Sequence, residues 1–398
     1  MTATARRPLT PPTGAARLLA GADGSPVLAR HEAVFGPLGR GVDVAALAAE
    51  AGLRGRGGAG FPTARKLAAV AGQRGRPLVV ANGAEGEPAS KKDRSLLRVA
   101  PHLVLDGAEL AATAVGAEGI VLALSRPVPE LERAIAERTR HPRDRTGMEI
   151  RRVPDRFVAG EETALIRALA GRAAKPTLKP PYPFERGVDG RPTLVQNVET
   201  LAHLALIARF GPAWFGGGTA LVTLGGAFAR PGVHEIPLGV TLGDVVSRSG
   251  GLTAPVSGYL VGGYFGTWVA PAEASSLALT PDVLGAGAIV ALPESTCAVA
   301  ECARVVRYLA GESAGQCGPC VHGLAAMADA LTSGGDRRPN LRRWAGMVEG
   351  RGACRHPDGA ARFVRSALEV FEREFERHAR RRGCGQRCTG VLPVGGRR

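Results

Sequence analysis

A glycine-rich segment at residues 52–63 constrains the fold and function of this chain more than any other part of its sequence. The segment reads Gly-Leu-Arg-Gly-Arg-Gly-Gly-Ala-Gly-Phe-Pro-Thr, and five of its first nine residues are glycine. Glycine lets the backbone turn with positive φ and approach a ligand closely, and successive N–H groups in such a turn form an anion site. Two arginines and the nearby Lys66 add positive charge. The segment is therefore predicted to hold a nucleotide phosphate.

The spacing Gly55-x-Gly57-x-x-Gly60 also matches the dinucleotide-binding fingerprint. That fingerprint requires a strand before the glycines and a helix after them. Residues 42–51 have a helical pattern instead, so we do not expect a conventional Rossmann turn. The alternative interpretation is a glycine-rich surface loop without a ligand.

The residues around this loop alternate between strand-like and helical patterns. Short apolar runs at 77–81 and 119–125 predict buried strands. Helical patterns occur over residues 64–71, 103–115, 129–139, 157–170 and 193–210. This alternation is typical of an α/β domain with parallel strands.

The pattern changes near residue 216. Short strand-like runs and one helix predict a small α+β unit over 216–292, and mostly helical segments follow. We therefore divide the chain into an N-terminal arm (1–45), an α/β domain (46–215), an α+β domain (216–292), a helical domain (293–380) and a basic tail (381–398) that we expect to be mobile.

Polar clusters follow the glycine loop within the α/β domain. Ligands of open α/β sheets lie beyond the carboxyl ends of the strands, which is where Asn82, Glu85 and Glu87 follow the run at 77–81. Glu161 and Glu162 stand at a predicted helix start, where carboxylates suit the helix dipole. A third cluster is the proline-rich run at 179–183. Each cluster also has a simpler explanation. These are helix capping for Glu161 and Glu162, a rigid turn for the prolines at 180–183, and a solvated loop for Glu85 and Glu87.

Four segments together resemble one family, the NADH- and FMN-binding subunit of NADH–quinone oxidoreductase, respiratory complex I. Related flavin subunits occur in NAD-linked hydrogenases and formate dehydrogenases. The segments are the loop at 52–63, Asn-x-x-Glu-Gly-Glu-Pro at 82–88, Gly-Glu-Glu-Thr-Ala-Leu at 160–165, and Lys-Pro-Pro-Tyr-Pro with Asn-Val-Glu-Thr at 179–200. The resemblance extends over residues 45–380. It implies an FMN-binding α/β domain, a β-grasp (SLBB-like) domain and a helical iron–sulfur bundle.

The resemblance also implies roles for particular residues. The FMN phosphate and ring edge would be held by the loop with Lys66, that is by Gly55, Arg56, Gly57, Gly58, Gly60 and Lys66. The ribityl and phosphate side would be held by Asn82, Asn197 and Thr200, and Gln196 is a further cofactor-binding candidate. The cavity between flavin and NADH would be lined by Glu85, Glu87, Glu161 and Glu162, and the nicotinamide nucleotide would be bound by Phe61, Lys179 and Tyr182. Glu87, Glu161 and Glu162 are the expected catalytic carboxylates, beside hydride transfer from NADH to flavin.

The chain departs from the family pattern at four positions in or near the predicted site. Ala84 replaces an aspartate, Phe157 usually a tyrosine, Gln196 an asparagine, and Leu67 an aromatic residue. Each lost hydrogen bond to a ligand weakens binding by about 0.5–1.5 kcal/mol. A non-catalytic paralogue that serves as a scaffold or assembly factor is the alternative function.

All seven cysteines lie between residues 297 and 388. Four thiolates hold a [4Fe–4S] cluster, and the resemblance assigns Cys317, Cys320 and Cys354 to it, whereas Ala314 stands at the fourth position. The alternatives for the fourth position are a water ligand or one of four residues, His322, His356, Cys384 and Cys388. A three-iron cluster, which needs no fourth ligand, is a further alternative. A structural zinc site of Cys317-x-x-Cys320 with Cys384-x-x-x-Cys388 is the rival. For Cys297 and Cys302 we expect buried apolar packing.

Composition narrows the partners. The formal charge is +15, but aromatic residues make up only 5% and no reader motif for nucleic acid occurs, so no nucleic-acid partner is expected. We expect neither a secretory signal nor a membrane span. The predicted protein is cytoplasmic, alone or at the inner face of the membrane within a complex, and passes electrons to other redox subunits or a ferredoxin-like protein.

Overall fold

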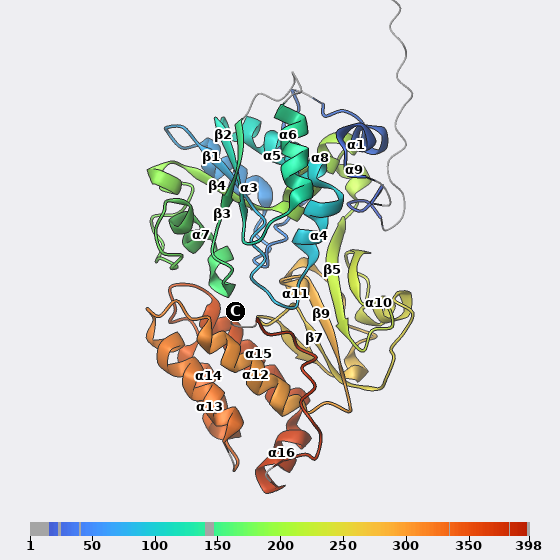
Figure 1. The fold of residues 1–398 in the computed structure, drawn as a ribbon, viewed down its shortest axis with the longest axis vertical. Helices are drawn as coiled ribbons and strands as arrows, with labels where there is room; N and C mark the ends of the chain where they lie inside the picture. The colour runs from blue at the N-terminus through green and yellow to red at the C-terminus, as the bar shows by residue number, and fades with distance from the viewer. Residues whose placement is uncertain are drawn as a thin grey trace, which may run out of the picture.

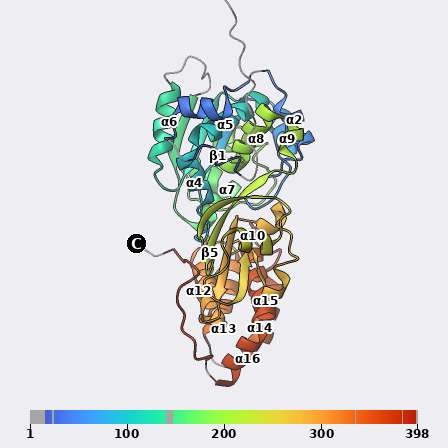
Figure 2. The same cartoon turned by 90° about the vertical axis from the view of Figure 1, so that its right-hand side faces the viewer.

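The computed structural model describes residues 16–22, 25–39, 41–139, 147–333, 335–381 and 383–395. The chain forms three packed units (Figure 1). The α/β domain lies at one end, and the second sheet and the helical domain lie side by side below it, as the rotated view also shows (Figure 2). Residues 1–15 of the expected N-terminal arm lie outside the described residues.

The first sheet contains four parallel strands in the order β3-β2-β1-β4. Their bounds are β1 Leu78–Asn82, β2 Gly119–Leu124, β3 Gly147–Arg152 and β4 Thr193–Asn197. The parallel α/β prediction is confirmed. Because β1 and β4 are adjacent and in register, Asn82 pairs with Asn197 at their shared carboxyl edge.

Helices cover both faces of this sheet, which explains why its strands are apolar throughout rather than alternating. Val79 and Ala81 join the core with α5 (Pro101–Val115) and α8 (Val198–Phe210), whereas Leu78 and Val80 pack toward α7 (Glu162–Leu169) on the other face. The remaining helices of this domain are α1 Leu28–Phe35, α2 Val44–Glu50, α3 Thr63–Ala71, α4 Lys92–Val99, α6 Pro129–Thr139 and α9 Pro212–Phe215.

The second sheet has five strands in the order β6-β5-β9-β7-β8. They are β5 Thr219–Gly226, β6 Gly232–Pro237, β7 Val256–Val261, β8 Thr267–Val269 and β9 Ala288–Pro293. Strands β5 and β9 are parallel and the other neighbours are antiparallel, so the sheet is mixed. Helix α10 (Leu242–Arg248) starts with a capping box between Thr241 and Asp244, and α11 (Pro281–Leu284) is a single turn.

The helical domain follows directly. It comprises α12 Ala298–Gly311, the turn η4 Pro319–Leu324, α13 Ala325–Thr332, α14 Arg338–Val348, α15 His356–Val370 and α16 Glu372–Arg381. Trp268 of β8 packs edge-on against Phe371 and near Phe363, so the helical domain and the second sheet share one apolar core.

The expectation of a mobile tail is wrong for residues 383–395. The tail folds back along α12, where Cys297 N–H donates to Arg387 O at 3.0 Å and Leu392 is fully buried. The Glu301 carboxylate accepts from Gly390 N–H at 2.6 Å and Leu392 N–H at 3.2 Å. Residues 396–398 lie outside the described part of the chain.

Several secondary-structure predictions also need correction. Residues 193–197 form strand β4 rather than the start of a helix, because the helix begins only after the Asn197 cap. Helix α1 lies in the N-terminal arm, where no helix was predicted, and strands β3 and β9 were not predicted either. Within the described residues, no helix is long and apolar enough to cross a bilayer.

Candidate functional site

The glycine loop closes over the carboxyl edge of the first sheet. It is preceded by α2 and followed by α3, so the prediction that it is not a Rossmann turn is confirmed. The loop folds on itself through Gly55 N–H, which donates to Phe61 O at 2.9 Å. Gly58 and Gly60 adopt positive φ values of 97° and 57°. A Cβ at Gly57 would lie 3.3 Å from Asn197 Cβ, so glycine allows the loop backbone to reach the sheet edge.

The two edge asparagines connect separate segments. Asn82 Nδ2 donates to Gly160 O at 3.0 Å, which links β1 to the start of α7. Asn197 Nδ2 donates to Asp93 Oδ2 at 2.7 Å, and its own Oδ1 caps α8 by accepting from Glu199 N–H. The asparagines therefore arrange the polar groups around the glycine loop.

Glu162 joins the two lysines that the sequence singled out. Its carboxylate lies 2.6 Å from Lys66 Nζ and 2.9 Å from Lys179 Nζ. Burial alone would raise the pKa of Glu162, but the two ammonium groups hold it below its ordinary value. The loop at 179–182, α3 and α7 are thus brought together beside the glycine loop, with one more positive than negative charge among these three groups.

The neighbouring Glu161 has a structural task. Its Oε2 accepts from the N–H groups of Thr163 and Ala164 at 2.9 and 3.0 Å, and from the Thr163 hydroxyl. The capping explanation is confirmed for Glu161. Its predicted catalytic role stays a prediction.

Glu85 and Glu87 are held inside the protein rather than in a solvated loop. Glu85 accepts from the Ser90 hydroxyl at 2.8 Å and from Asp93 N–H at 3.1 Å. Glu87 accepts from Ala89 N–H at 3.1 Å and Tyr264 N–H at 2.7 Å, so it connects the first domain to the second. Burial raises the pKa of both carboxyls, that of Glu87 to about 7.

A buried charged network lies beneath the loop, and no role was predicted for its residues from the sequence. Lys92 Nζ lies 2.7 Å from Asp93 Oδ1 and 2.8 Å from Glu199 Oε2, and all three side chains are almost inaccessible. Asp93 also holds Asn197. The signal in the sequence was the Lys-Lys-Asp-Arg run at 91–94, which follows the acidic 82–88 segment closely.

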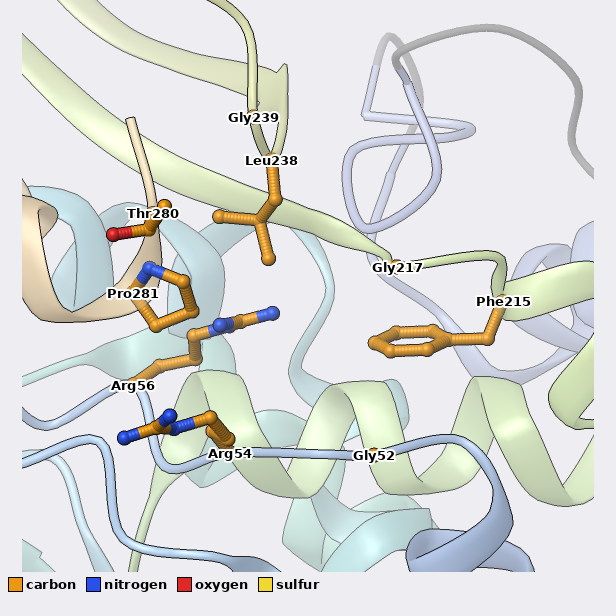
Figure 3. Close-up of a pocket in the computed structure, with 9 residues that line it drawn as sticks. All are labelled: Gly52, Arg54, Arg56, Phe215, Gly217, Leu238, Gly239, Thr280 and Pro281. Atoms are coloured by element: carbon orange, nitrogen blue, oxygen red, sulfur yellow. The ribbon is translucent and has the colours of Figure 1, made fainter. Parts of the chain in front are cut away.

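Arg56 and Thr200 occupy the underside of the loop. Arg56 N–H donates to the Thr200 hydroxyl at 2.8 Å, and the Arg56 guanidinium donates to Thr219 O at 3.1 Å. The Arg56 side chain points into a cavity of ≈ 290 Å³ toward Phe215, beside Leu238 and Pro281 (Figure 3). Among the described residues that line this cavity, Arg56 is the one that the sequence assigned to cofactor binding. Its side chain is directed at the second domain, where it contacts Thr219 O.

The aromatic candidates differ in exposure. Phe61 is 50% exposed and Tyr182 is 43% exposed, and the Tyr182 ring stacks on Phe184. Leu67, by contrast, is buried in the core, so a larger aromatic ring at this position would be in the core of the domain. Gln196 donates to the Thr63 hydroxyl at 3.2 Å, on the first turn of α3.

Phe157 lies at the junction with the helical domain. Its ring contacts the rings of Phe265 and His356, with centroids 4.8 and 5.6 Å away. Glu312, at the end of α12, accepts from Phe157 N–H at 2.8 Å and from Arg156 Nε at 2.9 Å. This joint fixes the cysteine region against the start of α7.

The three predicted cluster cysteines influence one another electrostatically. Burial, together with the neighbouring thiols, raises the pKa of Cys320 to about 12 and of Cys354 to about 11. Cys317 Sγ accepts from Ala353 N–H at 3.4 Å, next to Cys354. The Ser313 side chain lowers the pKa of Cys320, against the effect of burial. The structure thus places Cys317, Cys320 and Cys354 in one region of the helical domain, although their sulfur atoms do not all lie within 4.8 Å of one another.

Three of the four replacement residues proposed from the sequence are engaged elsewhere, and His322 is exposed. His356 Nε2 pairs with Leu309 O at 2.8 Å, and Cys388 Sγ with Glu301 Oε1 at 3.1 Å. Cys384 lies in a group with Cys297, which is the one set of three or more potential metal ligands found within 4.8 Å of one another in the described ranges. The rival zinc site of Cys317, Cys320, Cys384 and Cys388 is not supported, because Cys384 lies beside Cys297 and Cys388 beside Glu301.

Two family models match this chain. The Nuo51 FMN-binding domain matches residues 48–206, and the NADH-ubiquinone oxidoreductase-F iron-sulfur binding region matches residues 300–378. The NADH-quinone oxidoreductase F 2 subunit of Rhizobium meliloti (strain 1021) is 32% identical over 380 residues, covering 86% of this chain and 90% of the relative. The chain belongs to this family. The resemblance expected from the sequence is confirmed.

Hydrogenase subunits are similar as well. The NADP-reducing hydrogenase subunit HndC of Solidesulfovibrio fructosivorans is 30% identical over 387 residues, covering 88% of this chain and 79% of the relative. A chain from the crystal structure of NAD+-reducing [NiFe]-hydrogenase in the air-oxidized state superposes with a TM-score of 0.80 at 32% identity, covering 90% of this chain. The chain described here spans 66% of that hydrogenase chain.

Proposed function

We propose that this member of the family is an NADH dehydrogenase module that uses FMN and passes electrons to an iron–sulfur cluster. The carrying observation is the convergence, at one sheet edge, of the glycine loop, the paired asparagines and the Lys66–Glu162–Lys179 group, next to three cysteine thiols. When bound, FMN accepts a hydride and gives up its electrons one at a time, which is chemistry that no side chain supplies.

The residues at the sheet edge fit the phosphate end of a flavin nucleotide. The loop offers backbone N–H groups, glycines at the points of closest approach, and Lys66 on the first turns of α3. Lys66 and Lys179 supply the positive charge, and Phe61 and Tyr182 offer exposed aromatic faces. We assign Asn82 and Asn197 to orienting the nucleotide, since both amides are fixed by neighbouring segments.

The carboxylates take different parts in this proposal. Glu162 orients the two lysines, whereas Glu161 holds the start of α7 in place. Glu87 lies between the two domains, and its raised pKa lets it hold a proton near neutral pH. We assign these three residues to shaping the space between flavin and NADH.

Cys317, Cys320 and Cys354 fit three of the four ligand positions of a [4Fe–4S] cluster. Ala314 supplies no ligand, and the hydroxyl of the neighbouring Ser313, which influences the pKa of Cys320, is an oxygen candidate in the same loop. The site therefore fits a cluster held by three thiolates and one oxygen or water ligand.

The wider setting follows from the relatives. We propose that the second domain has the β-grasp topology of the family, supported by its mixed five-stranded sheet and by helix α10. We place the protein in the cytoplasm, against other redox subunits and at the inner membrane face or beside a ferredoxin-like carrier. The free state of all seven cysteines agrees with a reducing compartment.

The test is anaerobic reconstitution with FMN, iron and sulfide, followed by titration with NADH. We expect a yellow protein whose flavin absorbance at about 450 nm bleaches within the mixing time. Lys66→Met should weaken FMN binding, whereas Arg65→Met, one residue earlier in α3, should not. A protein that stays colourless after FMN addition refutes the enzyme and supports a scaffold.

A further inference from the structure

Four side chains from three separate segments converge at the far end of the helical domain. Cys297 caps the start of α12, Glu374 and His378 project from α16, and Cys384 lies on the returning tail. One potential ligand atom from each residue lies within 4.8 Å of every other. Cys297 Sγ is 3.3 Å from His378 Nε2, which is 4.0 Å from Glu374 Oε1.

We propose that these four residues bind a structural zinc ion. Two thiols, one imidazole and one carboxylate are all ligands that zinc accepts, and soft thiolates select zinc over magnesium or calcium. Glu374 and His378 are spaced four residues apart, so both project from one face of α16. No step of this inference depends on the flavin or on the function proposed above.

The geometry is close to a tetrahedron. Zinc–sulfur bonds of about 2.3 Å and zinc–nitrogen or zinc–oxygen bonds of about 2.0–2.2 Å place tetrahedral ligand atoms roughly 3.3–3.8 Å apart. The observed group, with every separation at or below 4.8 Å, reaches that arrangement by contracting about 1.5 Å at its widest. Side-chain rotation on the tail and on α16 is sufficient for this.

The surroundings orient the ligands in the way that zinc sites require. The N-terminal turn of α12 supplies two backbone donors: Ala300 N–H lies 3.3 Å from Cys297 Sγ, and Val299 N–H lies 3.5 Å from Glu374 Oε1. A helix N-terminus favours negative charge, and the ligand set carries three negative charges once both thiols are ionised. Cys297 and Glu374 are also buried, so water competes little for the ion.

Zinc at this point would fasten the tail to the bundle. Cys384 lies just before the stretch that pairs with Thr296 and Cys297 and then inserts Leu392 into the core. Loss of the ion should therefore release residues 383–395 before it disturbs the cluster cysteines, none of which belongs to the group.

The first test is the metal content and coordination of the wild-type protein purified without chelators. Inductively coupled plasma mass spectrometry should find about one zinc per chain. Zinc-edge X-ray absorption should show two sulfur ligands at about 2.3 Å and two nitrogen or oxygen ligands at about 2.0–2.2 Å. Because this measurement uses the unaltered chain, it does not depend on the folding of any variant. Less than about 0.2 zinc per chain, or a shell of three or four sulfurs, would overturn the proposal.

Variants then locate the ion. Cys384→Ser and His378→Gln should each lose the zinc, and tryptic cleavage of the tail should accelerate. The matched control is Cys388→Ser, four residues along the same tail, whose thiol pairs with Glu301 instead. Zinc should also persist in the triple variant Cys317→Ser, Cys320→Ser and Cys354→Ser. Zinc lost with that triple variant and retained in Cys384→Ser would refute the site.

A disulfide between Cys297 and Cys384 is the rival outcome. Anaerobic alkylation followed by peptide mapping distinguishes it, because a zinc site leaves both cysteines open to alkylation once the ion is chelated. A 297–384 disulfide in wild-type protein without zinc would refute the proposal.

Discussion

Replacing Lys92 with methionine tests the buried network beneath the glycine loop. The Lys92 ammonium lies 2.7 Å from Asp93 and 2.8 Å from Glu199, in a region that water hardly reaches. Burial alone would lower the pKa of Lys92, but the two carboxylates raise it above its ordinary range. Against the opposing effect of burial, Lys92, with help from His203 and Arg56, lowers the pKa of Glu199 to about 2.

Methionine keeps the volume of the side chain and removes only the charge. Removing one partner from a buried ion pair costs about 3–5 kcal/mol, because the remaining charge is left uncompensated. For a domain of about 150–250 residues, each kcal/mol corresponds to roughly 2–4 °C in melting temperature. We therefore expect the transition of the α/β domain to fall by about 6–20 °C.

The measurement is urea and thermal unfolding followed by circular dichroism, with FMN affinity by fluorescence quenching in parallel. Lys91→Met is the matched control, since Lys91 is exposed and its loss should cost no more than about 0.5 kcal/mol. The double variant Lys92→Met/Glu199→Gln should recover part of the loss, with a coupling of about 0.5–3 kcal/mol. If Lys92→Met unfolds within about 1 kcal/mol of Lys91→Met, the network does not carry the stability assigned to it.

Three further outcomes are expected. Burial raises the folded-state pKa of Glu87 to about 7 from 4.5. The stabilisation from protonated Glu87 is therefore complete below pH 4.5 and falls by about 3 kcal/mol as the pH rises through 7. Glu87→Gln should flatten the pH profile of the unfolding free energy between these values, and an unchanged slope would contradict this. Ala314→Cys should supply the fourth thiolate and raise iron toward four per chain with a stronger electron paramagnetic resonance signal on reduction, and unchanged iron would show that the position is not beside the cluster. Asp106→Asn removes a carboxylate buried among two arginines and a histidine and should cost about 3–5 kcal/mol in chemical unfolding, whereas the exposed Asp282→Asn should cost less than about 1 kcal/mol.

The sequence predicted the parallel layer well because its strands and helices carry strong local signals. The runs at Leu78–Asn82 and Gly119–Leu124 are apolar and bounded by turns, and both are strands. Strand β4 was misread as helix because Thr193–Asn197 continues directly into the apolar pattern of α8. The boundary is marked only by the Asn197 cap, which accepts from Glu199 N–H.

The site was predicted less completely, because the partners of each residue come from distant segments. The glycine loop and the lysines were found from their composition, but the pairing of Lys66 and Lys179 through Glu162 depends on tertiary contact. The network of Lys92, Asp93 and Glu199 was missed for the same reason: charged residues in a sequence are usually solvated, and only the fold reveals that these are buried.

The tail shows the same limit in another form. The basic, glycine-rich composition of residues 381–398 indicates a mobile end. Burial of Leu392 and the hydrogen bonds to Glu301 show that docking outweighs that tendency. No local pattern indicates that Cys297 and Cys384, 87 positions apart by their numbers, meet beside α16.

The carboxylate of Glu312, which grips Arg156 and the Phe157 backbone across the domain boundary, has a consequence for the speed of electron flow. Electron transfer slows steeply as the separation between two redox centres grows. Under the proposed function, this contact would help to hold the flavin-binding edge and the cysteine region at a fixed separation.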